Sequence, residues 1–178
     1  MSAFELSRMI KPRALPAGEL AIEASEAERA ALAARFGITT LPAVSATVAF
    51  VPKGEAVLAR GSLAATVEQP CAISREDFSY TIAEDFELRF VPAGERAEHE
   101  PDEEFELAAD DLDEIEYEGD AFDIGEAIAQ ELGLAIDPYR EGPDADRVRA
   151  EKGIESDEDR APSGPLAEAL AALKGREG

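Results

Sequence analysis

The sequence predicts an α+β domain: an antiparallel sheet of about five or six strands with two main helices packed on it, followed by a short C-terminal helix. The sheet is predicted because apolar residues alternate with polar ones between residues 40 and 90. The helices are predicted by two segments that combine capping residues with a helical apolar period. The sequence lacks the βαβ pattern that is typical of a parallel sheet. The antiparallel sheet could curl toward a barrel.

The N-terminal stretch alternates Phe4 and Leu6 with polar neighbours, which favours a short first strand. Arg8, Lys11 and Arg13 follow among prolines, so they are expected on a loop. Such a basic loop could contact RNA phosphates, but three charges are a weak signal and are more typical of an ordinary solvated loop.

The first helix is predicted to begin after Ser25, which forms a capping box with Glu28. An Ala-rich run continues to Phe36, and Gly37 occupies the position of a left-handed C-terminal cap. Leu32 and Phe36 are four residues apart, so we expect both to face the sheet.

The strands are predicted over residues 40–50, 57–67 and 78–90, where apolar side chains recur at every second position. Residues 52–55 read Pro-Lys-Gly-Glu and predict the turn of a hairpin. Successive strands with short connections favour an antiparallel meander.

An acidic segment follows, in which thirteen of the twenty-three residues from Glu98 to Asp120 are Asp or Glu and none is Lys or Arg. Mutual repulsion argues against a wholly ordered segment. Apolar residues at strand spacing nevertheless predict two short strand pieces within it: Phe105 with Leu107, and Ile115 with Tyr117.

A second helix is predicted after Asp123, which can cap it with Glu126 in the reciprocal position. Its apolar face repeats every four residues, at Ile124, Ile128 and Leu132. Gly133 is expected to end or bend this helix.

The predicted domain organisation is a core over residues 1–139, a flexible acidic linker over 140–162, and a short helix over 163–174. The linker is charged, rich in Gly and Pro, and nearly devoid of large apolar residues. The short helix starts at a proline and carries an apolar stripe of Leu166, Leu170 and Leu173. It is too short to be stable alone in water.

The sequence lacks the residues that disulfides, Cys/His metal sites and several common catalytic motifs require. The single cysteine, Cys71, and the single histidine, His99, cannot form a disulfide or a Cys/His metal site within one chain. Phosphate-binding glycine loops, HExxH and GxSxG motifs are missing, and the acidic run fails the calcium-loop pattern. We therefore expect no catalytic residue, no cofactor and no bound metal, and Cys71 is interpreted as a small buried residue. No apolar run is long enough for a membrane helix and no secretory signal is recognisable, so the expected location is the cytoplasm.

The charge of −23 is concentrated in the C-terminal part of the chain, because residues 76–178 carry thirty-three Asp or Glu against nine Lys or Arg. Such a field repels DNA and RNA and attracts basic proteins. The predicted partner-binding residues lie in the acidic segment: Glu103, Glu104, Asp110, Asp111, Asp113 and Glu114. One alternative is that the acidity serves only solubility.

Two further hypotheses remain open. The chain could bind rRNA directly through Arg8, Lys11, Arg13 and Arg60. It could also be a carboxylate-metal nuclease, an interpretation that rests on acidic pairs such as Asp110 with Asp113.

The order of several segments resembles the YceD family of large ribosomal RNA subunit accumulation proteins. The segments that carry the resemblance are the short N-terminal strand, the hairpin ending in GSLAATVEQPCAIS, FSYTIAEDFELRFVP, the acidic run, FDIGEAIAQELGLAIDP and GPLAEALAALK. The resemblance implies a ribosome biogenesis factor that supports accumulation of large-subunit rRNA and works by protein binding. Together with the charge asymmetry, this link predicts that the partner is a large-subunit ribosomal protein or a pre-ribosomal particle. Genes of the family commonly neighbour one for a small large-subunit ribosomal protein.

Many relatives carry a Cys-x-x-Cys in the strand region and further cysteines after the second helix. Here Cys71 matches the first position, Ser74 replaces the second, and residues 137–149 contain no cysteine. The resemblance therefore implies that any zinc-binding capacity of relatives is absent from this protein.

Overall fold

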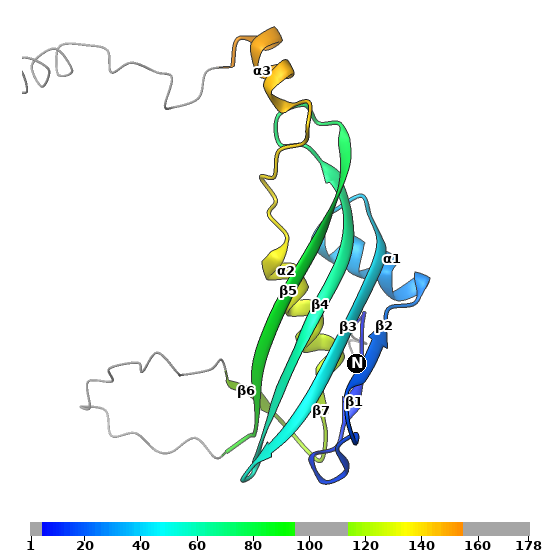
Figure 1. Ribbon diagram of the computed structural model, residues 1–178, viewed down its shortest axis with the longest axis vertical. Helices are drawn as coiled ribbons and strands as arrows, with labels where there is room; N and C mark the ends of the chain where they lie inside the picture. Colours follow the sequence, from blue (N-terminus) through cyan, green and yellow to red (C-terminus); the bar gives the residue numbers. More distant parts are fainter. Residues whose placement is uncertain (1–4, 95–113, 155–178) are drawn as a thin grey trace, which may run out of the picture.

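The computed structural model describes residues 5–94 and 114–154. Its centre is a five-stranded sheet of three long, curved strands flanked by two short ones (Figure 1). The strands in spatial order are β2 (Leu20–Glu23), β3 (Thr40–Lys53), β4 (Ala56–Pro70), β5 (Asp77–Pro92) and β6 (Glu114–Tyr117). A separate two-stranded ladder pairs β1 (Met9–Ile10) with β7 (Phe122–Asp123). The helices are the 3-10 turn η1 (Pro12–Ala14), α1 (Glu26–Phe36), α2 (Ile124–Ala135) and α3 (Ala145–Lys152).

This arrangement confirms the predicted α+β class, whereas the expectation that the sheet approaches a barrel is wrong. The sheet stays open because β2 and β6 form its two edges and do not pair with each other. Both edge strands have only four residues, too few to join the long strands into a closed cylinder. The sheet instead buries one face against α1 and α2 (Figure 1).

Two strand predictions need correction. Leu6 is almost fully buried but lies outside any strand, and the first strand is formed by Met9 and Ile10. The sheet is also not purely antiparallel, because β6 runs parallel to β5 with Phe90 opposite Ile115. A parallel pair needs a long connection, and the acidic segment between the two strands supplies it.

Helix α1 has the predicted caps. The Ser25 side chain accepts from the Glu28 amide, Glu28 accepts from the Ser25 amide, and Gly37 is left-handed. Helix α2 is capped by Asp123 as predicted, but Glu126 bonds to Arg35 of α1 at 2.9 Å instead of returning to the cap. The chain continues as helix through Gly133, where the glycine leaves room for the ring of Phe36.

The core lies between the sheet and α2, whose residues Ile124, Ile128 and Leu132 are at most 1% exposed. They pack with inward residues of the long strands, including Val48, Leu63 and Phe90. Burying each large aliphatic side chain contributes about 1.5–3 kcal/mol, so this face supplies much of the stability of the fold.

Helix α3 lies within residues 140–162, where the sequence predicted a linker without regular structure. Ala145 and Val148 are buried, and Gly153 ends the helix in the left-handed conformation. The composition hid this helix because only two small apolar residues anchor it. Residues 155–162 and the predicted helix over 163–174 lie outside the described residues, as do Phe105 and Leu107 of the predicted strand pieces.

Within the described ranges, no helix is both long enough and apolar enough to span a lipid bilayer.

Candidate partner-binding surface

Strand β6 places the end of the acidic segment on the sheet with a fixed orientation. Ile115 and Tyr117 pack against the core, and the Tyr117 ring lies 5.7 Å from that of Phe122. Their neighbours Glu114 and Glu116 are exposed, as is Glu118 directly after the strand. The strand alternation predicted for Ile115 and Tyr117 is thereby confirmed. We call β6 and the turn over residues 118–120 the acidic end.

The carboxylates of the acidic end differ in their partners. Glu114, a predicted binding residue, forms an ion pair with Arg89 of β5 at 2.8 Å. Asp120 accepts a hydrogen bond from Lys11 at 2.8 Å, which lowers the pKa of Asp120. In the described part of the chain, Glu116 and Glu118 form no ion pair. These two carboxylates therefore present uncompensated charge to solvent.

The other predicted binding residues cannot be placed on this surface. Glu103, Glu104, Asp110, Asp111 and Asp113 lie outside the described residues. The sequence reasoning did not select Glu116 and Glu118, although the Glu-Ile-Glu-Tyr-Glu alternation already indicated that all three glutamates share an outward face.

The four basic residues of the rRNA hypothesis are not brought together as one patch. Arg8 donates to Glu28 at 2.6 Å, and its backbone amide donates to Asp123 at 2.7 Å. Arg60 pairs with Glu87 on the exposed face of the sheet. Arg8 in particular ties the N-terminal segment to α1 and α2, which is a structural role.

The Arg8–Glu28 pair has a clear electrostatic signature. The hydrogen bond from Arg8 lowers the pKa of Glu28 to about 2, against an ordinary value of 4.5, and outweighs the opposing effect of burial. Hydrogen bonds from the backbone and side chain of Ser25 act in the same direction as Arg8.

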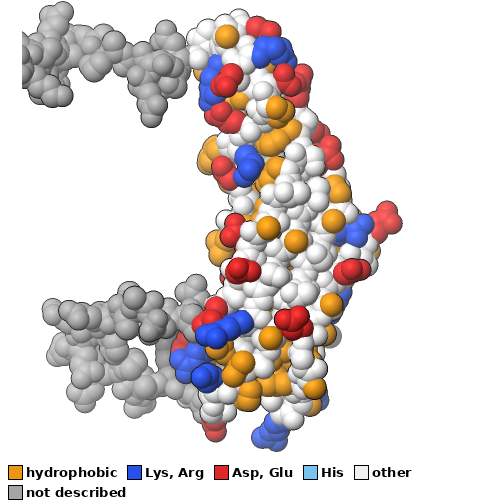
Figure 2. Space-filling view, in the orientation of Figure 1, with side chains coloured by type: hydrophobic (Ala, Val, Ile, Leu, Met, Phe, Trp, Pro, Cys, Tyr) orange, Lys and Arg blue, Asp and Glu red, His pale blue; other side chains and the backbone are white. Residues whose placement is uncertain are grey.

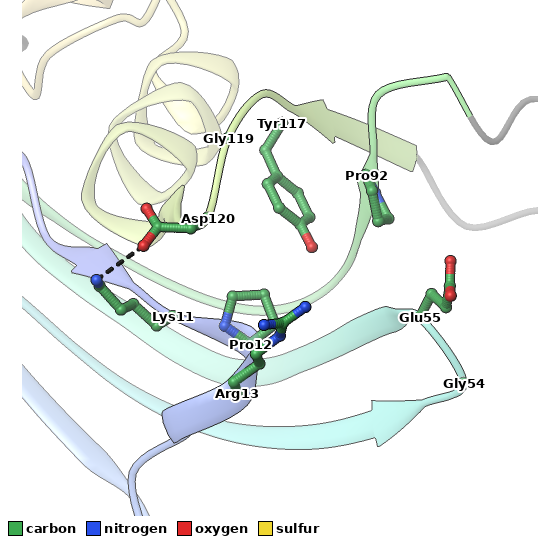
Figure 3. A pocket seen from close by; sticks show the side chains of 9 residues that line it. All are labelled: Lys11, Pro12, Arg13, Gly54, Glu55, Pro92, Tyr117, Gly119 and Asp120. Carbon is green, nitrogen blue, oxygen red and sulfur yellow. Dashed lines mark hydrogen bonds and ion pairs between the residues drawn. The ribbon is translucent and has the colours of Figure 1, made fainter.

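A pocket of about 530 Å³ lies beside the acidic end (Figure 3). Lys11, Arg13 and Pro12 form one wall, and Tyr117 and Pro92 face them. Lys11 is held by Asp120, whereas Arg13 makes no ion pair with any described residue. The Arg13 guanidinium interacts electrostatically with Asp120, and the aromatic ring opposite it can help to accept a planar or anionic group.

The opposite end of the sheet is organised around Cys71. Residues 69–76 and 137–142 meet there, and we call them the Cys71 junction. Cys71 is 1% exposed, and its sulfur accepts from the backbone amides of Ile73, Ser74 and Gly142 at 3.2–3.4 Å. Burial opposes ionisation, but these bonds and one from the Ser74 side chain lower the pKa of Cys71 to about 7.

The same junction contains a satisfied polar core. Buried Gln69 donates to the Asp137 carbonyl at 2.8 Å and accepts from the Tyr80 hydroxyl at 2.9 Å. The Arg140 guanidinium lies 4.2 Å from the centre of the Tyr80 ring. The two segments in which the resemblance places cysteines thus meet in space, joined by hydrogen bonds.

This junction does not fit a zinc ion, because Cys71 is its only thiolate. Among residues 5–94 and 114–154, no group of three Cys, His, Asp or Glu side chains could hold a metal. The pair Asp110 and Asp113, on which the nuclease interpretation rested, lies outside these ranges.

The face of the sheet turned away from the helices carries small, uncharged side chains in its centre (Figure 2). Exposed residues from all three long strands contribute to it: Ser45, Thr47, Ser62, Ala64, Thr81 and Ala83. Acidic and basic side chains lie around this uncharged centre on the same face (Figure 2).

A family model described as large ribosomal RNA subunit accumulation protein YceD matches residues 59–174. The match begins in β4, so the N-terminal segments included in the resemblance lie outside it. No curated protein and no solved structure matches this chain. Because the matched residues make up more than half of the chain, this protein belongs to the YceD family.

Proposed function

We propose that this protein is a non-enzymatic ribosome biogenesis factor that supports accumulation of large-subunit rRNA in the cytoplasm. It acts by binding a basic ribosomal protein, free or on a pre-ribosomal particle, through an acidic face. The family description supplies the link to large-subunit rRNA. The acidic face is centred on the acidic end and includes the carboxylates before it, Glu103, Glu104, Asp110, Asp111 and Asp113.

One observation carries this proposal. Strand β6 is fixed to the core by Ile115 and Tyr117, and it holds Glu116 outward without a compensating cation among the described residues. Because the backbone of β6 is already ordered, an exposed carboxylate on it loses only side-chain freedom when it engages a partner. They also accelerate encounter with a basic protein.

The test is a pull-down of the full chain from growing cells, with ribosomal proteins and rRNA quantified in the eluate. The variant Glu116→Gln with Glu118→Gln is expected to recover several-fold less ribosomal protein than the wild type. The matched control is Glu19→Gln with Glu23→Gln, two exposed carboxylates at the opposite edge of the sheet. Equal recovery from both double variants would contradict the proposal.

A second candidate is direct binding of rRNA at the pocket, favoured by Arg13 opposite Tyr117. There, a base could stack on the ring while the guanidinium pairs with a phosphate. The ion pairs of Arg8, Lys11 and Arg60 weigh against the wider patch. Arg13→Gln would abolish salt-dependent binding of rRNA fragments under this candidate and leave protein capture unchanged under the first.

A further inference from the structure

Strand β5 has an unpaired edge over residues 81–88. It pairs with β4 without a register shift from Asp77 to Phe90, and with β6 only from Arg89 onward. At its beginning, the Cys71 junction packs on the rings of Phe78 and Tyr80. Between these two regions, no described residue pairs with the edge of β5 that faces away from β4. We call residues 81–88 the open edge.

The direction of the backbone groups at this edge follows from the ladder. The amide of Ala93 donates to the Tyr117 carbonyl, so it points toward the β6 side. Backbone groups alternate direction along a strand, and no bulge interrupts β5. Thr81, Ala83, Asp85 and Glu87 therefore direct their N–H and C=O groups outward. Four residues with unpaired donors and acceptors form a template for another strand.

Several of the devices that usually block a free edge are missing here, and of the others only acidic side chains are present. Residues 81–88 contain no proline, lysine or bulge, and the opposite edge strand, β2, has only four residues. The charges on the open edge are all acidic: Glu84 and Asp85 are exposed without an ion pair in the described chain, and Glu87 pairs with Arg60. A second copy of this chain would bring the same negative charges alongside.

We propose that the open edge receives an extended, Lys/Arg-rich segment of the protein partner as an added β-strand. The main-chain bonds would provide affinity, and Glu84 and Asp85 would select for basic side chains. This inference rests on the proposed function for the identity of the partner, and it adds a binding mode and a second contact region beyond the acidic end.

The probe is a synthetic ten-residue peptide that alternates Lys with Val, titrated against the full chain. Its counterpart carries N-methyl groups at alternate residues, so that it has the same charge but cannot form one row of strand hydrogen bonds. We expect the unmodified peptide to bind at least tenfold more tightly. Hydrogen exchange at the amides of Thr81, Ala83, Asp85 and Glu87 should slow at least tenfold when it binds.

The matched protein variants are Ala83→Pro, which removes one outward N–H, and Ala83→Thr, which retains it. Proline is tolerated where an edge N–H faces solvent, and urea unfolding verifies that both variants fold. Binding should fall at least tenfold in Ala83→Pro only. Equal affinity for the two peptides would overturn the inference, and so would outward amides already protected in the free protein. Sedimentation would then identify a second copy as the occupant.

The experiments distinguish failure of the proposed function from failure of the strand-addition proposal. If Glu116→Gln with Glu118→Gln loses ribosomal protein in the pull-down while Ala83→Pro retains it, the acidic end binds the partner and strand addition is wrong. If neither double variant of the pull-down changes recovery but the peptide protects the edge amides, the partner class is wrong and the edge remains a strand-binding site.

Discussion

The two ends of the sheet treat their polar groups in opposite ways. At the Cys71 junction, the sulfur, Gln69 and the Tyr80 hydroxyl all bond to groups within the fold. At the acidic end, Glu116 and Glu118 face solvent without a cation among the described residues. A polar group that is already satisfied contributes to stability, whereas an exposed, unpaired one is available to a partner. The contrast predicts that the first end governs folding and the second governs binding.

The largest effect on stability is expected from Cys71→Ala. This change leaves three partly buried amides, those of Ile73, Ser74 and Gly142, without their acceptor. An unmade buried hydrogen bond costs about 1–3 kcal/mol, and a small cavity adds to it, so we expect a loss of about 2–4 kcal/mol. Urea unfolding measures it. The control is Cys71→Ser, whose hydroxyl can still accept and which should lose less. Equal stability of Cys71→Ala and the wild type would remove the structural role assigned to this end.

Lowering the pH should reveal the contribution of a third region, the Arg8–Glu28 pair, to the stability of the fold. The pKa of Glu28 is depressed to about 2 in the fold, below its ordinary value of 4.5. The pair with Arg8 therefore stabilises the protein fully above the unfolded pKa, and this contribution disappears as the pH falls from about 5 toward about 2. Both side chains are partly exposed, so we expect about 1–2 kcal/mol.

The measurement is the free energy of unfolding of wild type and Glu28→Gln between pH 3 and pH 7, for which the wild type should lose its advantage as pH falls. A constant difference over that window would show that the ion pair does not carry the effect. Arg8 was one of the predicted RNA-binding residues, and this result would place it with the structural groups.

The features that could be predicted from the sequence are those encoded within a few residues. The capping box of Ser25 and Glu28, the Asp123 cap and the outward alternation around Ile115 all depend on neighbours, and the fold retains them. The ion pairs could not be predicted in this way. Lys11 bonds to Asp120 across 109 positions, and Arg8 bonds to the capping residue Glu28 itself. Such partners depend on strand order, which local patterns do not determine.

The same limit applies to the candidate surface. The acid content drew attention to residues 98–120, but composition cannot distinguish a carboxylate paired with an arginine from one that is free. Glu114 was selected and is paired with Arg89, whereas Glu116 was not selected and is exposed without such a pair. The open edge was also missed, because an unpaired strand edge is a property of the whole sheet.

The smallest effect on stability is expected at the acidic end itself. Glu116→Gln with Glu118→Gln removes two exposed charges that make no ion pair with a described residue, so the free energy of unfolding should change by no more than about 0.5 kcal/mol. Any change should be a gain, because the variant relieves repulsion in a chain of charge −23. Thermal and urea unfolding of the variant, compared with Glu19→Gln plus Glu23→Gln, measure it. A loss above 1 kcal/mol would mean that these carboxylates serve the fold, and the distinction between the two ends would fail. A neutral result combined with a several-fold loss of captured ribosomal protein is the combination that only a binding surface predicts.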